Sequence, residues 1–262
     1  PTKKSSFFAL VLEDTLGRNL GTWHHWAFEG SLLAGIVRAA TDRRMYPVVA
    51  TAHHGTDEGG IQHIGKIING GVFGTIVRSP GLALDKFLRA RIKQGHPVVV
   101  IFPSRLSTWP TNALDVDNIE IGRTAGRILL SRGRRNWVLV HYQQVEGAHR
   151  LRCEGFLQFA RDAGMKPHVL QLGMDVDEFA AREQLTPELT RLKPDGLFAI
   201  DSVSSVGTAM GTLAAGFKPG EDIDLIGCDC SLFTSQNVPT ITSIDISWRE
   251  VGVFAINKLI EL

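Results

Sequence analysis

Residues 137–163 have the sequence WVLVHYQQVEGAHRLRCEGFLQFARDA, and this stretch decides the fold. Its apolar beginning, residues 137–142, predicts a strand, and residues 149–163 predict a helix. A further apolar run at 169–172 predicts a second strand. A strand, a helix and a strand in this order form a parallel β-α-β unit, because the helix carries the chain back to the start of the neighbouring strand.

Strands and helices alternate along the chain on both sides of this unit. Strands are predicted at 7–12, 46–51, 72–77, 98–102, 196–200 and 225–228, the last of these closing its half of the chain. Helices are predicted at 28–43, 61–69, 84–93, 121–131 and 206–215, with another that ends near 187–191. Such regular alternation is typical of doubly wound parallel sheets, so we predict an α/β fold.

A loop with two prolines, Pro103 and Pro110, interrupts the alternation before it restarts. Two successive α/β sets of similar size predict two lobes with a cleft between them. We assign residues 1–103, with about 247–262, to the N-terminal lobe and about 104–246 to the C-terminal lobe. In open α/β sheets ligands bind beyond the carboxyl ends of the strands, so the residues at these ends are the first candidates for a site.

The composition argues against several classes of protein. The formal net charge is +1, whereas a surface that holds nucleic acid by itself is usually more basic. The short basic clusters at 43–44 and 132–135 are interpreted as solvated helix ends. The longest apolar runs have the length of strands, far below the roughly 18 to 20 residues that cross a bilayer. We therefore expect no membrane partner.

The three cysteines indicate the compartment of the protein. Cys153, Cys228 and Cys230 form no disulfide framework, which is typical of a reduced, cytoplasmic chain. No second pair of cysteines or histidines at zinc spacing follows Cys228 and Cys230. We expect neither a metal nor a cofactor.

Catalytic motifs are missing from the sequence. It contains no nucleophile elbow, phosphate-binding loop or zinc-protease motif. The histidine pairs at 24–25 and 53–54 are interpreted as solvated or hydrogen-bonded loop residues. Asp14, Asp201 and Asp229 follow predicted strands, where carboxylates perform acid–base chemistry or accept hydrogen bonds from the hydroxyls of a bound polyol. Without a nucleophile beside them, binding is favoured, and we predict that the protein is not an enzyme.

Five segments resemble the LacI/GalR (lactose-repressor) family of transcription regulators, in the expected order along the chain. They are VDNIEIGRTAGRILLSRGRR at 116–135, RLRCEGFLQFARDAG at 150–164, PDGLFA at 194–199, PGEDIDLIGCD at 219–229 and VPTITSIDISWREVG at 238–252. Each motif alone is weak, and the five in sequence are strong. The resemblance implies two lobes of the periplasmic-binding-protein type I, with an effector site in their cleft.

The resemblance also implies residues that hold the effector. Arg152 matches the family arginine that reaches the ligand, and Asp229 matches an acceptor at the end of a strand. Asp201 and Ser202 stand where the family usually has Asn and Asp, which leaves the chemistry of this corner open. Phe102 stands where many members have an acidic residue. The other candidates are Asp14 and His53 at strand ends and, in the loop that replaces the family's S-N-P-F segment, the aromatic residues Trp23, Trp26 and Phe28, which either stack on a sugar or fill the edge of the lobe.

The function that the resemblance implies is the effector-sensing core of a homodimeric regulator, dimerised mainly through the N-terminal lobe and binding a sugar or sugar derivative. Family members bind operator DNA through an N-terminal helix-turn-helix headpiece, for which this chain has no counterpart. Effector binding would change the angle between the lobes. The alternative interpretation is a periplasmic solute-binding protein of a sugar transporter, because these proteins have the same architecture.

We predict that this chain alone does not recognise operator DNA, because its net charge is near zero and the expected headpiece is missing. Repeated selection from a pool of random duplexes at physiological salt should enrich no sequence. A duplex that is retained specifically would contradict this prediction.

Overall fold

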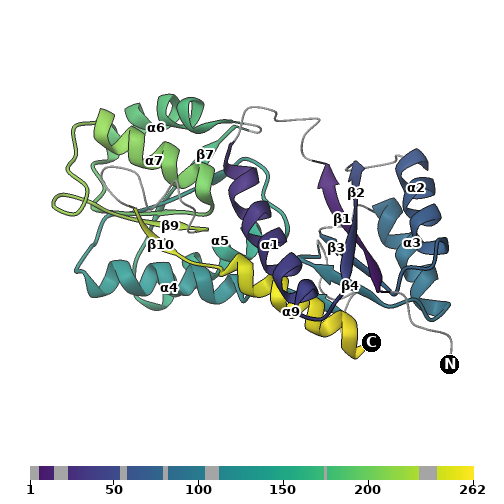
Figure 1. Cartoon of the computed structure of the whole chain (residues 1–262). Helices are drawn as coiled ribbons and strands as arrows, with labels where there is room; N and C mark the ends of the chain where they lie inside the picture. Colours follow the sequence, from purple (N-terminus) through teal and green to yellow (C-terminus); the bar gives the residue numbers. More distant parts are fainter. Residues whose placement is uncertain are drawn as a thin grey trace. The chain divides into compact units, whose positions relative to one another are not determined.

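The computed structural model describes residues 6–14, 23–53, 58–78, 82–103, 112–173, 176–229 and 241–262. It has an α/β fold whose described strands form two five-stranded sheets (Figure 1). The chain divides into two compact units, the first made of Pro1–Val116 with Ser247–Leu262 and the second of Asp117–Ile246. Among the described residues, no helix has the length and apolarity needed to cross a membrane.

The first unit is a parallel sheet with helices on both faces. Its strands are β1 (Phe7–Asp14), β2 (Tyr46–His53), β3 (Thr75–Arg78), β4 (Val98–Ile101) and β5 (Ala113–Leu114), in the order β2-β1-β3-β4-β5. Its helices are α1 (Trp23–Thr41), α2 (Glu58–Asn69), α3 (Leu82–Lys93) and α9 (Trp248–Glu261). Successive strand residues point to opposite faces, so Val99 packs with α1 and α9, while Val98 and Val100 pack with α2 and α3.

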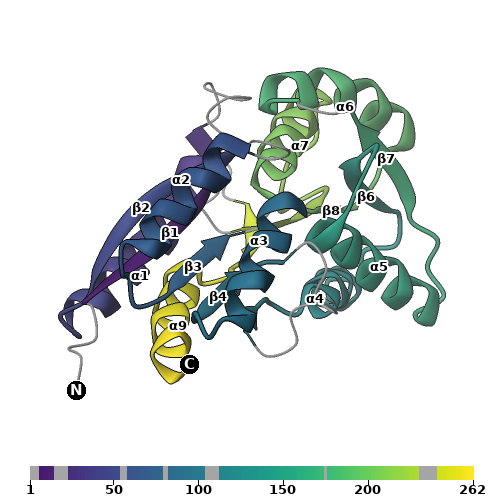
Figure 2. The same ribbon diagram turned by 90° about the vertical axis from the view of Figure 1, so that its right-hand side faces the viewer.

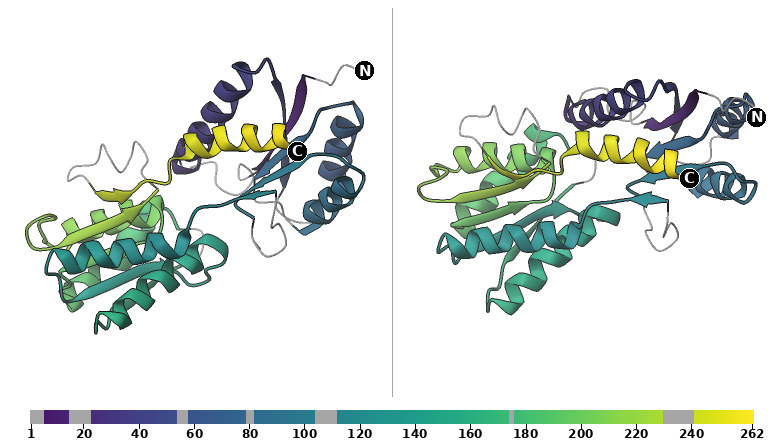
Figure 3. Two further views of the ribbon diagram at one scale, coloured as in Figure 1. Left: turned by 90° about the horizontal axis from the view of Figure 1, so that it is seen from below. Right: turned by 60° about the horizontal axis from the view of Figure 1, so that its bottom comes forward.

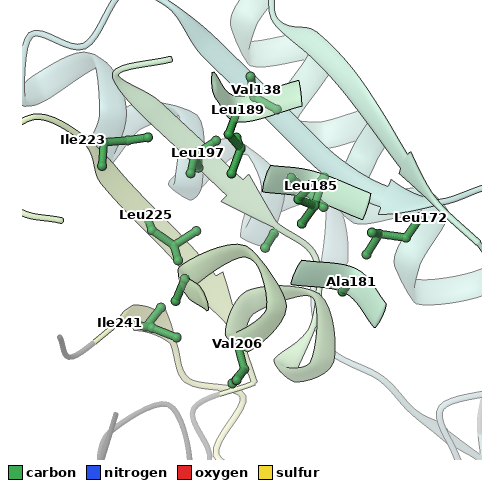
Figure 4. Close-up of a cluster of buried hydrophobic side chains, with 13 residues drawn as sticks. Val138, Leu172, Ala181, Leu185, Leu189, Leu197, Val206, Ile223, Leu225 and Ile241 are labelled. Carbon is green, nitrogen blue, oxygen red and sulfur yellow. The ribbon is translucent and has the colours of Figure 1, made fainter. Parts of the chain in front are cut away.

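The second unit repeats this arrangement. Its strands are β6 (Trp137–Tyr142), β7 (His168–Leu172), β8 (Gly196–Ala199), β9 (Asp224–Cys228) and β10 (Thr242–Ile244), in the order β10-β9-β8-β6-β7. Helices α6 (Glu178–Leu192) and α7 (Ser202–Ala214) cover one face, and α4 (Asn118–Ser131) and α5 (Gly147–Asp162) cover the other (Figure 2). Figure 4 shows the core under α6 and α7, in which Leu185 and Leu189 meet Val138 and Leu197 from the strands.

Both sheets have the same connectivity. Counted from its own first strand, each runs in the order 2-1-3-4-5, and every pairing between its strands is parallel. In this order the direction of winding reverses between the first and third strands, which are β1 and β3 in one unit and β6 and β8 in the other. Ligands of doubly wound sheets bind at this switch point, at the carboxyl ends of the strands.

Helices α4 and α5 touch through their backbones. A Cβ atom on Gly122 would lie 2.0 Å from the carbonyl oxygen of Arg152, and one on Gly155 would lie 2.0 Å from that of Ile119. No side chain fits at these distances, so only glycine allows this approach. The contact fixes α5, and with it Arg152, against α4.

Helices α1 and α9 of the first unit lie side by side (Figure 3), and glycines again allow the close approach. A Cβ atom on Gly35 would lie 2.0 Å from the carbonyl oxygen of Arg249, and one on Gly252 would lie 2.4 Å from that of Leu32. In each unit, two helices that approach each other closely at glycine positions therefore cover one face of the sheet.

Two short strands correct the predicted organisation. The prediction ended the first part of the N-terminal lobe at residue 103, but β5 adds to that sheet, with Val100 N–H donating to Asn112 O at 2.8 Å. The first unit therefore continues to Val116. The strand at 225–228 was also expected to be the last of its half, whereas β10 follows it and pairs with β9. Both strands have three residues or fewer, too few for a hydrophobic period to show.

The segment that contains Trp23, Trp26 and Phe28 was predicted as a loop and lies in α1, which begins at Trp23. This segment contains neither the proline of the family pattern nor a glycine, so no residue in it prevents the helix from beginning at Trp23.

Among residues 132–135, Arg132 is solvated as interpreted, with 43% of its side chain exposed, whereas Arg134 is only 20% exposed, and both arginines form an ion pair that the interpretation did not include. Arg132 Nη1 and Arg134 Nε lie 2.7 and 2.6 Å from the two oxygens of buried Asp224. Burial alone would raise the pKa of Asp224, but hydrogen bonds from Arg134 and Arg132 lower it below its ordinary value. These two ion pairs connect the end of α4 to the start of β9.

We predict that Gly155→Ala destabilises the protein by about 1–3 kcal/mol, because the added methyl group forces α4 and α5 apart. Gly30→Ala is the matched control, since it adds the same methyl group to α1, where nothing lies within 4 Å. Removing glycine from an open helical position stabilises by up to about 1 kcal/mol. Urea unfolding measures both variants, and equal stabilities would contradict the role of Gly155.

Candidate ligand-binding site

The carboxyl ends of the central strands of the second unit bring a group of polar residues together. Tyr142 is the last residue of β6, and Asp229 directly follows β9. Asp201 lies two residues after β8, as the N-cap of α7. Because these strands are parallel neighbours, all three residues lie at one edge of the sheet.

Arg152 and Asp229 form a two-point ion pair at this edge. Arg152 Nη1 lies 3.2 Å from Asp229 Oδ2, and Arg152 Nη2 lies 3.4 Å from Asp229 Oδ1. Arg152 also donates from Nε to Asn118 Oδ1 at 3.0 Å and from Nη1 to the carbonyl oxygen of Ile200 at 2.7 Å. These four hydrogen bonds use four of the five N–H groups of a guanidinium and hold it in one orientation.

The two partners differ in exposure. The side chain of Arg152 is 4% exposed, while that of Asp229 is 15% exposed. Burial alone would lower the pKa of Arg152, but the charge of Asp229 raises it, so the arginine stays protonated. Asp229 has a φ of 63°, and its N–H donates to the carbonyl oxygen of Ile244 at 3.1 Å. The carboxylate is thus held by Arg152 on one side and keeps a partly open edge.

Tyr142 and Asp201 form a second contact at the same edge. The Tyr142 hydroxyl donates to both carboxylate oxygens of Asp201, at 3.0 and 2.9 Å. Asp201 Oδ1 also accepts from Ser204 N at 2.8 Å and Ser204 Oγ at 2.7 Å, and the Asp201 N–H donates to Ser204 Oγ at 3.1 Å, which completes a capping box. Burial first, and then the negative charge of Asp201, raise the pKa of Tyr142 well above its ordinary value.

His149 lies beside this contact, in the first turn of α5. Its Nε2 is 3.6 Å from Asp201 Oδ2, and its ring centre is 6.0 Å from that of Tyr142. The side chain of His149 is 38% exposed, but the protein groups packed around its ring desolvate it, which is the main cause that lowers its pKa, and Arg152 adds to this effect against the pull of Asp201 and Asp229. The imidazole is therefore neutral at pH 7.

The chemistry of the edge is that of hydrogen bonding. Cys228 is buried beside Asp229, and burial raises the pKa of its thiol well above the ordinary value. Burial also raises the pKa of Cys153 to about 12. Neither thiol is a nucleophile at neutral pH. Within the described ranges, no group of three His, Cys, Asp or Glu residues is arranged to hold a metal ion.

Four residues predicted from the sequence meet in the second unit: Arg152, Asp229, Asp201 and Ser202. Ser202 is the first residue of α7 and is buried. The prediction missed three others that the structure brings to the same edge: Asn118, Tyr142 and His149. The strand-end rule points to Tyr142, which ends a predicted strand, whereas Asn118 and His149 become visible only when α4 and α5 are packed.

The remaining predicted residues lie in the first unit. Asp14 and His53 end β1 and β2, and Trp23, Trp26 and Phe28 lie in α1, but the side chains of all five are outside the described part of the structure. Phe102 follows β4 with a φ of 51°, and its ring meets that of Trp248 edge-on at 4.8 Å. Phe102 therefore packs against the start of α9.

An ion pair at the switch point of the first unit was also missed. Arg78, the last residue of β3, places Nη1 3.1 Å from Oε1 of Glu29 on α1. Their side chains are 14% and 13% exposed. No motif signals this pair, because its partners are 49 residues apart in the sequence.

The sequence of the chain is similar to a known domain family and to a known regulator. Residues 126–262 match the model of the periplasmic binding protein-like domain. The HTH-type transcriptional regulator DegA of Bacillus subtilis is 22% identical over 197 residues, which are 71% of this chain and 55% of that regulator. The chain therefore spans little more than half the length of this relative.

Solved structures share the fold over nearly the whole chain. A LacI family transcriptional regulator from Enterococcus faecium with bound ribose matches with a TM-score of 0.77 and 21% identity, over 97% of this chain and 89% of that one. The lac repressor dimer bound to operator and the anti-inducer ONPF matches with a TM-score of 0.80 and 17% identity, over 99% and 87%. At these identities the likeness is one of fold.

Proposed function

Because the chain belongs to the family of periplasmic binding protein-like domains, we propose that it is the effector-sensing core of a LacI-type transcription regulator. The observation that carries the proposal is the Arg152–Asp229 pair at the carboxyl edge of the second sheet. A buried guanidinium that makes two hydrogen bonds to one carboxylate and two to other groups of the protein is unfavourable for a scaffold alone, since an apolar pair of similar size often packs as well. A ligand-binding role accounts for the desolvation of this ion pair.

The proposed effector is a small polar molecule, a sugar or a sugar derivative. The partly open edge of Asp229 accepts hydrogen bonds from ligand hydroxyls, and Arg152 holds this carboxylate and donates to a ligand oxygen with its remaining N–H. The ribose-bound relative supports this class of ligand. Ser202 and Asp201 are proposed to lie beside the ligand. The roles of Asp14, Trp23, Trp26, Phe28, His53 and Phe102 remain predictions.

The proposed regulator is cytoplasmic, is not an enzyme, and reaches operator DNA through a headpiece outside this chain. The names of DegA and the lac repressor support regulation over solute transport. The effector would act by binding two forms of the regulator with different affinities, since a ligand shifts an equilibrium only by that difference.

The first test identifies the ligand and then removes its partners. A thermal-shift screen of pentoses, hexoses and disaccharides finds sugars that stabilise the folded chain. We expect Arg152→Ala and Asp229→Asn each to weaken binding of such a sugar by about 2–5 kcal/mol, or roughly 30-fold to several thousand-fold, because one charged group is left unpaired in a buried site. Isothermal titration calorimetry measures the affinities.

The matched control is Arg150→Ala, which removes an exposed arginine from the same helix. It should leave affinity unchanged, since exposed ion pairs contribute little. Melting curves without ligand separate the two possible roles of the pair. Variants of Arg152 and Asp229 that melt early but bind normally would show a scaffold pair and overturn the proposal.

The second test concerns assembly. We expect a homodimer formed mainly by the first unit, because regulators of this type bind two half-sites as dimers. Val37 on α1 and Tyr46 and Val49 on β2 are large apolar residues that are at least 40% exposed there, which supports this surface. Light scattering over a concentration series should show a dimer, and Val49→Asp should shift it toward monomer. A wild-type chain that stays monomeric at high micromolar concentration would contradict the prediction.

A further inference from the structure

Tyr142, Asp201 and His149 form a corner beside the Arg152–Asp229 pair, which we call the Tyr142 corner. Its members come from the end of β6, the N-cap of α7 and the first turn of α5. Neither Tyr142 nor His149 belongs to the segments matched for ligand contacts, so the resemblance gives them no role. The hydrogen bond within the corner nevertheless has a defined donor, the Tyr142 hydroxyl, and a defined acceptor, the Asp201 carboxylate.

Asp201 is almost fully occupied by the protein. Its Oδ1 accepts from the backbone and hydroxyl of Ser204, and both of its oxygens accept from Tyr142. A carboxylate has about four acceptor positions, and these contacts leave capacity only on Oδ2. The side chain is 13% exposed. Asp201 is therefore well suited to hold its neighbours and poorly suited to be the main contact of a ligand.

Tyr142 is turned into an acceptor by this contact. A phenol has a single O–H, and that of Tyr142 points to Asp201. The backbone of Ser204 also interacts with the phenol, so the oxygen offers another molecule acceptor capacity only, on its remaining lone pair. The raised pKa of Tyr142 keeps the proton on the phenol at neutral pH, so the direction of the bond is fixed.

His149 leaves room for a donor between itself and Asp201. The separation of 3.6 Å between Nε2 and Oδ2 is too long for a hydrogen bond, and the side chain of His149 is 38% exposed. As a neutral imidazole, it has one ring nitrogen that accepts. A donor that enters from solvent can therefore bond to the imidazole nitrogen and to the free position on Oδ2.

Among the described residues of the second unit, the charges nearest the corner leave a net negative charge. Arg152 and Asp229 cancel, which leaves the carboxylate of Asp201, and Glu178 of α6 adds a further negative charge near Tyr142. Hydroxyl and ammonium groups suit such a field. Phosphate and carboxylate groups are repelled, because like charges in a partly buried site interact strongly.

We propose that the Tyr142 corner is a second ligand subsite, in which Tyr142, His149 and the free position on Asp201 Oδ2 contact the ligand, and in which Asp201 also orients the Tyr142 hydroxyl. The subsite takes a hydrogen-bond donor, either a hydroxyl or an ammonium group, and excludes acidic groups. The effector is accordingly a neutral or amino sugar and not a sugar phosphate or sugar acid. This inference rests on the proposed function, since it describes part of the same effector site.

The first experiment needs no ligand. The chain has two tyrosines, so Tyr46→Phe leaves Tyr142 as the only phenol that titrates. Near-ultraviolet absorbance should show its ionisation well above pH 10. Asp201→Asn should lower the midpoint, because the neighbouring negative charge is gone. Asp177→Asn, which removes the capping carboxylate of α6, is the control and should leave it unchanged. An unchanged midpoint in Asp201→Asn would overturn the positioning role.

The second experiment compares each sugar that binds in the screen with its amino and phosphate derivatives, by calorimetry. The parent and amino sugars should bind at least 10-fold more tightly than the phosphate. Tyr142→Phe, which keeps the ring, should weaken binding about 10-fold through the lost acceptor. It should also lower the melting temperature by a few degrees, roughly, because Asp201 loses a hydrogen bond, so the titrations are made well below that temperature. His149→Ala should also weaken binding.

Tighter binding of the phosphate, or normal affinity in both Tyr142→Phe and His149→Ala, would overturn the subsite even if the sugar binds well. A screen in which no neutral, amino or acidic sugar binds would instead overturn the proposed function, and with it the ligand role of the corner. The tyrosine titration would then still report whether Asp201 holds Tyr142, so the two failures are distinguishable.

Discussion

The contact between the backbones of α4 and α5 is the constraint on which the candidate site depends. Gly122 lies against the carbonyl oxygen of Arg152 itself, so the position of that residue is set by main-chain packing and not by its own side chain. From there the guanidinium reaches Asn118 on α4, the end of β8 and Asp229 after β9. One residue thereby links three elements, and a small shift of α5 would break all of these bonds together.

Three aspartates of the second unit show how surroundings give one side chain different tasks. Asp224 lies at the amino ends of the strands, where two arginines neutralise it and it ties α4 to β9. Asp201 caps a helix and orients a phenol. Within the described ranges, Asp229 pairs with one charged group, Arg152, and is partly exposed. The number of bonds that the protein itself makes to each carboxylate thus separates the two that are occupied by the protein from Asp229, the one proposed to bind a ligand.

Periodicity and strand order were sufficient to predict the fold. The α/β class and the LacI/GalR resemblance are confirmed, and the strand at 137–142 has the predicted bounds, because a central strand is apolar on both faces. Short edge strands such as β5 and β10 carry too few residues to show a pattern. For the candidate site, strand ends indicated Asp201 and Asp229. The bond between Tyr142 and Asp201 joins residues 59 positions apart, and only the folded sheet brings them together.

The glycine contact between α1 and α9 also has a consequence for biosynthesis. Helix α9 covers the sheet whose strands all precede Val116, and Gly252 packs against Leu32. A ribosome delivers the chain from its N-terminus at about 5–20 residues per second, and domains fold as units during this process. The second unit is complete once Ile246 has emerged, whereas the first has one sheet face covered by α1 alone until α9 arrives. The half of the molecule that is made first is therefore the half that folds last, and its exposed apolar face is what a chaperone would recognise during synthesis.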